Sequence, residues 1–142
     1  MKKMASTKTN TRYDGRPCGL LVSALLCVVG LGLLSRSYPL PGFLAEYTGD
    51  ALYAVAVFLA LAAVFRRSAT RSLACSAFVF SAAVELSQLL TWPLLMDLRQ
   101  TWLGALCLGQ GFQWADLLAY LVGVGAVAAL DRLVFRRHVL RA

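Results

Sequence analysis

An acidic side chain within an apolar stretch is the feature of this sequence most able to do chemistry. The run from Ser72 to Trp92 is 21 residues long and carries one carboxylate, Glu85, with Gln88 one helical turn later. A charge at the centre of a bilayer costs about 2.5 to 3.5 kcal/mol on insertion scales, so it usually faces protein or water and marks a functional site. Glu85 could therefore bind a ligand, transfer a proton or form a structural ion pair.

Other polar residues are expected to join Glu85 in an outward-facing polar pocket. Asp116 and Tyr120 are spaced i, i+4, with Gly123 at i+7, so they share one helical stripe. Arginine binds phosphate through two parallel hydrogen bonds, which makes Arg36 and Arg99 candidates for a phosphate contact. The candidate ligand-binding residues are Arg36, Asp50, Glu85, Gln88, Arg99, Asp116 and Tyr120, and the candidates for acid–base catalysis are Glu85 and Asp116.

Four apolar runs are expected to position these residues as transmembrane helices. About 20 apolar residues are needed to cross about 30 Å of hydrocarbon at a rise of about 1.5 Å per residue. Residues 102–109 are too short to span and are expected to form an interfacial or re-entrant segment before the last helix. The fold class is thus an all-α membrane protein with four transmembrane helices. The runs are Cys18 to Ser35, Ala51 to Phe65 with a start near Leu44, Ser72 to Trp92, and Gln113 to Leu130.

The distribution of positive charge predicts the orientation of these helices. Twelve of the 14 lysines and arginines fall before the first run, between the second and third, or after the last. Arg36 and Arg99 are the two exceptions. This split follows the positive-inside rule for four crossings with both termini in the cytoplasm of a bacterial inner membrane. It argues against nucleic acid as a partner, because a nucleic-acid-binding protein would gather its charges on one face.

The remaining composition predicts neither a metal site nor a cofactor. The four cysteines, Cys18, Cys27, Cys75 and Cys107, have no CxxC spacing, and the one histidine, His138, falls in the basic C-terminal region.

We expect residues 1–16 to form a disordered basic cytoplasmic tail, residues 17–135 the transmembrane domain and residues 136–142 a second basic cytoplasmic tail. Asp50 and Asp116 have a structural alternative as helix N-caps.

Several blocks of residues resemble one protein family over about residues 18–126. Tyr47-Thr48-Gly49-Asp50-Ala51-Leu52-Tyr53-Ala54 and Glu85-Leu86-Ser87-Gln88-Leu89 carry the resemblance, together with Arg36, Arg99, Thr101, Gly104, Leu108-Gly109, Phe112, Trp114, Asp116, Tyr120 and Gly123. They resemble the YjgA-like family of uncharacterised bacterial membrane proteins (domain of unknown function 2809). The order of Glu, Gln, Arg, Asp and Gly is distantly similar to VanZ-like proteins, which are linked to glycopeptide tolerance, although Tyr120 stands where those tend to have asparagine.

Three functions are compatible with these residues. The first is a cell-envelope binding protein whose pocket holds a lipid-linked or amphipathic ligand, with the lipid bilayer as its other partner. The second is a membrane-embedded enzyme using Glu85 or Asp116 on a lipid-linked substrate, although the sequence lacks the HExxH and GxSxG motifs. The third is an ion-coupled carrier in which Glu85 titrates. We also expect Arg99 to form an ion pair with Glu85. Tyr120 could be a hydroxyl partner of Glu85 or make an ordinary helix–helix contact.

Overall fold

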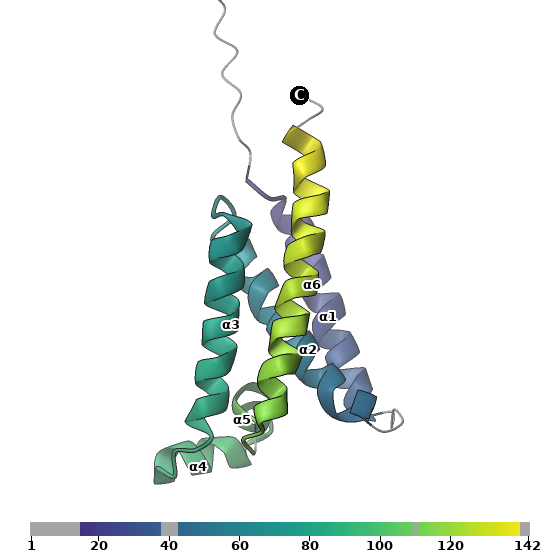
Figure 1. Cartoon of the computed structure of the whole chain (residues 1–142). Helices are drawn as coiled ribbons and strands as arrows, with labels where there is room; N and C mark the ends of the chain where they lie inside the picture. The colour runs from purple at the N-terminus through teal and green to yellow at the C-terminus, as the bar shows by residue number, and fades with distance from the viewer. Residues whose placement is uncertain (1–14, 38–42, 110, 140–142) are drawn as a thin grey trace, which may run out of the picture.

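The computed structural model describes residues 15–37, 43–109 and 111–139, without the side chains of residues 36, 37, 43–46 and 135–139. These residues form helices and contain no strand (Figure 1). The helices are α1 (Cys18–Ser37), α2 (Phe43–Val64), α3 (Thr70–Ser87), α4 (Pro93–Gln100), α5 (Trp102–Leu108) and α6 (Trp114–Val139). The all-α class predicted from the sequence is confirmed.

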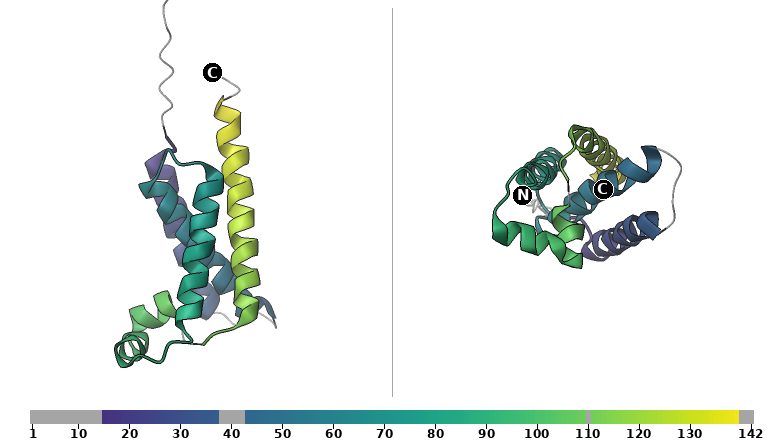
Figure 2. Two further views of the ribbon diagram at one scale, coloured as in Figure 1. Left: turned by 60° about the vertical axis from the view of Figure 1, so that its left-hand side comes forward. Right: turned by 90° about the horizontal axis from the view of Figure 1, so that it is seen from below.

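The four long helices alternate in direction and lie side by side (Figures 1 and 2). Helix α2 is central, because it packs against α1, α3 and α6, whereas α1 contacts only α2 among the described helices. The start of α1, the turn between α2 and α3 and the end of α6 lie at one end of the bundle. The short helices α4 and α5 lie at the other end, which we call the α4–α5 end.

Small side chains dominate the core between α2, α3 and α6. Phe58 is fully buried and is the largest apolar side chain in this core. Ala54, Ala62 and Ala77 are also fully buried, which leaves room for the neighbouring helix backbones to approach closely. The closest approach is at Gly123, where an added Cβ would overlap the carbonyl oxygen of Ala51. Gly123, which shares the predicted stripe of Asp116 and Tyr120, is therefore a point where α6 meets α2.

Three of the described helices are long and apolar enough to cross a membrane. These segments are Cys18–Ser35 in α1, Tyr47–Val64 in α2 and Trp114–Val134 in α6. Helix α3 is not among them, because Arg71, Glu85 and four serines lower the mean hydropathy of its 18 residues. The sequence predicted four such helices, and length and composition support three.

Helix α3 ends at Ser87, five residues before the predicted end at Trp92. Tight turns replace the helical pattern here, since the backbone N–H of Leu90 donates to the Ser87 carbonyl at 2.9 Å. The Arg99 guanidinium donates to the same carbonyl at 2.6 Å. Carbonyls at a helix C-terminus lack intrahelical donors and attract cations, so Arg99 caps α3.

The segment after α3 contains two helices where the sequence predicted a loop and one interfacial piece. Pro93 occupies the first turn of α4, where its missing N–H costs no hydrogen bond. Thr101 then caps α5, because its hydroxyl accepts a hydrogen bond of 3.0 Å from the backbone N–H of Gly104. The predicted non-spanning segment before the last helix is thus helical over Trp102–Leu108.

Arg16 is part of the folded domain, and its assignment to a disordered tail is wrong. Its side chain is 9% exposed and forms an ion pair of 2.7 Å with Asp131 of α6. It also donates to the carbonyls of Arg66 and Ser68, and Thr70 donates to the same Asp131 carboxylate at 2.6 Å. This network joins the segment before α1 to the α2–α3 turn and to α6.

Residues 1–14 and 140–142 of the predicted tails lie outside the described residues, and α6 extends through residues 136–139.

Candidate functional site

Glu85 is the centre of the candidate site. Its carboxylate is 1% exposed and accepts three hydrogen bonds from other parts of the chain. The donors are the Gln88 amide at 2.8 Å, the Gln113 backbone N–H at 2.9 Å and the Tyr120 hydroxyl at 3.0 Å. Together these three hydrogen bonds fix the orientation of the carboxylate. The predicted Tyr120 hydroxyl contact is confirmed.

These hydrogen bonds tie three elements together around one carboxylate. Gln88 follows α3, Gln113 immediately precedes α6, and Tyr120 lies two turns into α6. The i, i+3 spacing of Glu85 and Gln88 places their side chains on one helical face, so the amide reaches the carboxylate. Gln113 contributes through its backbone, which the side-chain pattern of the sequence could not indicate.

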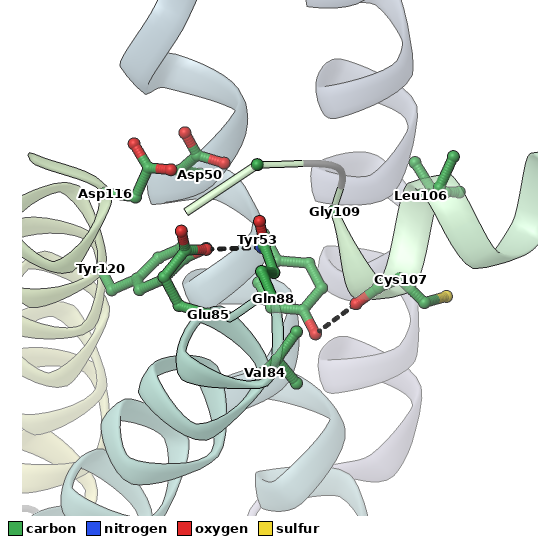
Figure 3. Close-up of a pocket in the computed structure, with 12 residues that line it drawn as sticks. Asp50, Tyr53, Val84, Glu85, Gln88, Leu106, Cys107, Gly109, Asp116 and Tyr120 are labelled. Atoms are coloured by element: carbon green, nitrogen blue, oxygen red, sulfur yellow. Dashed lines mark hydrogen bonds between the residues drawn. The ribbon is translucent and has the colours of Figure 1, made fainter. Parts of the chain in front are cut away.

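A cavity of about 240 Å³ opens beside Glu85 at the α4–α5 end (Figure 3). Polar residues on α2, α3 and α6 and the backbone around α5 line it. In Figure 3, Asp50 and Asp116 point into the same part of the cavity. Five of the seven predicted ligand-binding residues are therefore brought together. They are Asp50, Glu85, Gln88, Asp116 and Tyr120.

Gly109 closes one side of this cavity and has a backbone that only glycine adopts readily. Its φ is +67°, in the left-handed region, and an added Cβ would lie 2.5 Å from the amide nitrogen of Gln88. The chain can therefore pass directly over the Gln88 side chain after α5 ends.

A second, apolar groove of about 190 Å³ adjoins the polar cavity. It runs between α1, α2 and α5, and its lining includes Val28, Gly32 and Leu52. The cavity and the groove share three lining residues, Tyr53, Leu106 and Cys107. The Tyr53 hydroxyl donates to the Cys107 carbonyl at 3.1 Å, which fixes α5 against α2 at this shared wall (Figure 3). The sequence pattern did not indicate Tyr53 or Cys107 as site residues, because local periodicity does not predict how α5 packs against α2.

Arg99 does not form the predicted ion pair with Glu85. The Arg99 guanidinium donates instead to the carbonyls of Ser87 and Leu90 and to the Ser87 hydroxyl. The prediction failed because Arg99 lies on α4, a helix that holds it at the end of α3 and away from the interior face of α3. Arg99 does not line the polar cavity. Arg36 is in the last turn of α1, and its side chain lies outside the described residues.

Asp50 and Asp116 do not serve as N-cap residues. Helix α2 begins at Phe43, so Asp50 is two turns inside it, and Asp116 is the third residue of α6. An acidic group in the first turn still interacts favourably with the helix dipole. Among the described residues, no group of three histidine, cysteine or acidic side chains could hold a metal ion. Both residues line the polar cavity.

Tyr120→Phe should lower the free energy of unfolding by about 1.5 to 2 kcal/mol, because it removes one of three hydrogen bonds to a buried carboxylate. Tyr53→Phe is the matched control, since its hydroxyl donates to a neutral carbonyl in a more exposed position and should cost about 0.5 to 1 kcal/mol. Chemical denaturation in detergent measures both values. Equal losses would contradict the central role given to Glu85.

One family model covers this part of the chain. The model of the family described as "Protein of unknown function (DUF2809)" matches residues 39–124. The match includes α2 to α5 and the first half of α6, and so it contains every described residue that lines the polar cavity. No solved structure matches the chain significantly.

Proposed function

We propose that this chain, which belongs to the DUF2809 family of proteins of unknown function, is a membrane-embedded binding protein for an amphipathic, lipid-linked molecule. One observation carries the proposal: a polar cavity and an apolar groove share the wall formed by Tyr53, Leu106 and Cys107. A molecule with a polar head and a hydrocarbon chain matches such a pair of adjoining sites.

The lining of the polar cavity favours a head group rich in hydrogen-bond donors, such as the hydroxyls of a sugar. Asp50 and Asp116 contribute carboxylates, and Gln88 contributes an amide. A carboxylate is an acceptor, so it complements hydroxyl and amine donors. Arg99 lies outside the lining, so the phosphate contact expected for it is not part of this proposal.

A binding function is favoured over acid–base catalysis by Glu85. A general base must offer a free acceptor to the proton that it removes. Glu85 already accepts three hydrogen bonds from the protein and is almost fully buried. It acts in this proposal as the fixed point that holds Tyr120 and the start of α6 in place around the ligand.

Mass spectrometry of the purified protein should detect a co-purifying amphipathic molecule. Gly32→Leu would place a side chain in the apolar groove at a position where an added Cβ has no atom within 4 Å, and we expect it to reduce the retained molecule at least tenfold. Gly30→Leu is the control, since Gly30 also has open space around it but does not line the groove.

For the polar cavity, Asp50→Asn should reduce retention, and Asp97→Asn on the exposed face of α4 should not. Retention unaffected by both Gly32→Leu and Asp50→Asn would reject the proposal.

We also propose that all four long helices cross a bacterial plasma membrane, with both termini in the cytoplasm. Helix α3 packs against both α2 and α6, and its direction is opposite to both (Figures 1 and 2). Three exposed tryptophans, Trp92, Trp102 and Trp114, lie at the α4–α5 end, as expected at a membrane interface. The arginine-rich turn between α2 and α3 lies at the opposite end, as expected on the cytoplasmic side.

Alkaline-phosphatase fusions should be active after Arg99 and inactive after Arg67 or at the C-terminus. The expectation follows from the twelve-to-two distribution of basic residues. Green fluorescent protein fused at the same positions is the complementary reporter, since it fluoresces when it remains in the cytoplasm. Activity after Arg67 would reverse the orientation, and equal signals after Arg67 and Arg99 would show that α3 does not cross.

A further inference from the structure

The turn between α2 and α3 carries two arginines that no described acidic side chain neutralises. Arg66 and Arg67 are both exposed. The one ion pair among the described residues joins Arg16 to Asp131 and leaves these two guanidinium groups out. Two adjacent positive charges in one turn repel each other, so an anion between them would be stabilised.

Arg66 is held in position by the segment that precedes α1. Its Nε donates to the Arg16 carbonyl at 2.6 Å, and the Arg16 backbone N–H donates to the Arg66 carbonyl at 3.2 Å. Gly15 lies directly against the Arg66 backbone. The Arg66 side chain is therefore anchored through one nitrogen, while no described residue accepts a hydrogen bond from its two terminal nitrogens. A planar guanidinium fixed in this way is prepared to bind a phosphate oxygen pair.

A cavity of about 530 Å³ lies at this turn. Its wall combines the two arginines with the backbone of Gly15 and Ser68 and the apolar side chains of Val64 and Phe65. Val64 is 73% exposed and Phe65 is 54% exposed. Val64 ends a segment that can span the membrane, so the cavity lies where hydrocarbon gives way to head groups. A free anion would use the arginines only, whereas a phospholipid would also cover the two apolar side chains.

We propose that this cavity binds an anionic phospholipid, with its phosphate on Arg66 and Arg67 and its acyl chains along Val64 and Phe65. Charge complementarity favours an anionic lipid over a zwitterionic one. The site is separate from the polar cavity, because it lies at the opposite end of α2 and shares no lining residue with it. It requires that α2 crosses the membrane but does not depend on the ligand proposed for the polar cavity.

Native mass spectrometry and thermal melting of the full chain in a neutral detergent test this site. The probes are phosphatidylglycerol, phosphatidylcholine and inorganic phosphate. We expect at least fivefold more phosphatidylglycerol than phosphatidylcholine to be retained at equal concentration, and a higher melting temperature with phosphatidylglycerol only. Arg67→Gln should reduce retention of phosphatidylglycerol at least fivefold.

Arg71→Gln is the matched control. Arg71 is exposed at the same end of the bundle but does not line the cavity, so its replacement should leave phosphatidylglycerol retention within twofold of the original. Arg67 donates no side-chain hydrogen bond to another described residue, so Arg67→Gln should retain the melting temperature of the lipid-free protein. Equal losses in the two variants would show a general surface-charge effect and overturn the site. Equal retention of the two lipids would also overturn it, as would the same stabilisation by inorganic phosphate.

Discussion

Arg16→Leu is expected to lower the free energy of unfolding by about 3 to 5 kcal/mol, the largest loss among the substitutions considered. Removing one member of a buried ion pair leaves the other charge buried without compensation. Asp131 is 7% exposed, and Thr70 would be its remaining hydrogen-bond donor among the described residues. Thermal or chemical denaturation in detergent, followed by circular dichroism, measures the loss.

The double variant Arg16→Leu, Asp131→Leu should recover part of that stability. Replacing both members of a buried pair by apolar groups removes the unpaired charge, and the shortfall from additivity measures the coupling. Arg71→Leu is the control for loss of a positive charge at this end, since Arg71 is exposed and its replacement should change stability by about 0.5 kcal/mol or less. Additive losses at positions 16 and 131 would mean that the ion pair contributes no coupling energy.

Gly123→Val is expected to cost about 3 kcal/mol, because α6 could no longer reach α2. The obstacle is the backbone carbonyl of Ala51, which cannot rotate away as a side chain could. Loss of this contact would also displace Tyr120, one turn earlier on α6, from Glu85. The variant should therefore unfold at a lower temperature and retain less of the ligand of the polar cavity.

Gly125→Val provides a closely matched comparison for that experiment. Gly125 is on the same helix, is exposed, and has no atom within 4 Å of an added Cβ. The same change in intrinsic helix preference occurs in both variants, so their difference reports helix packing alone. Similar melting temperatures for the two variants would contradict the close α2–α6 contact.

The sequence was sufficient to predict the four long helices because long apolar runs leave few alternatives. The start of α2 near Leu44 followed from the length needed to span a bilayer, and the structure begins it at Phe43. The i, i+4 stripe of Asp116 and Tyr120 correctly placed the Tyr120 hydroxyl near Glu85. These successes depend on the helical period, which is a local property of the chain.

The errors concern contacts that local periodicity does not determine. The segment from Pro93 to Gln100 is too short to show a helical period clearly, so Arg99 was assigned to a loop able to fold over Glu85. Arg16 looked like one of several basic residues in a tail, since its partner is 115 residues away. The apolar groove depends on how α1, α2 and α5 pack, and an apolar run by itself does not predict that packing.

Arg16 and Asp131 are synthesised at different times, because 115 residues separate them along the chain. Translation at about 5 to 20 residues per second separates the synthesis of these two residues by roughly 6 to 23 s. During that interval Arg16 has been synthesised but Asp131 has not, so the guanidinium must remain hydrated or at lipid head groups. The first helix is therefore complete before its final anchor exists, and the ion pair can close only when Asp131 has left the ribosome.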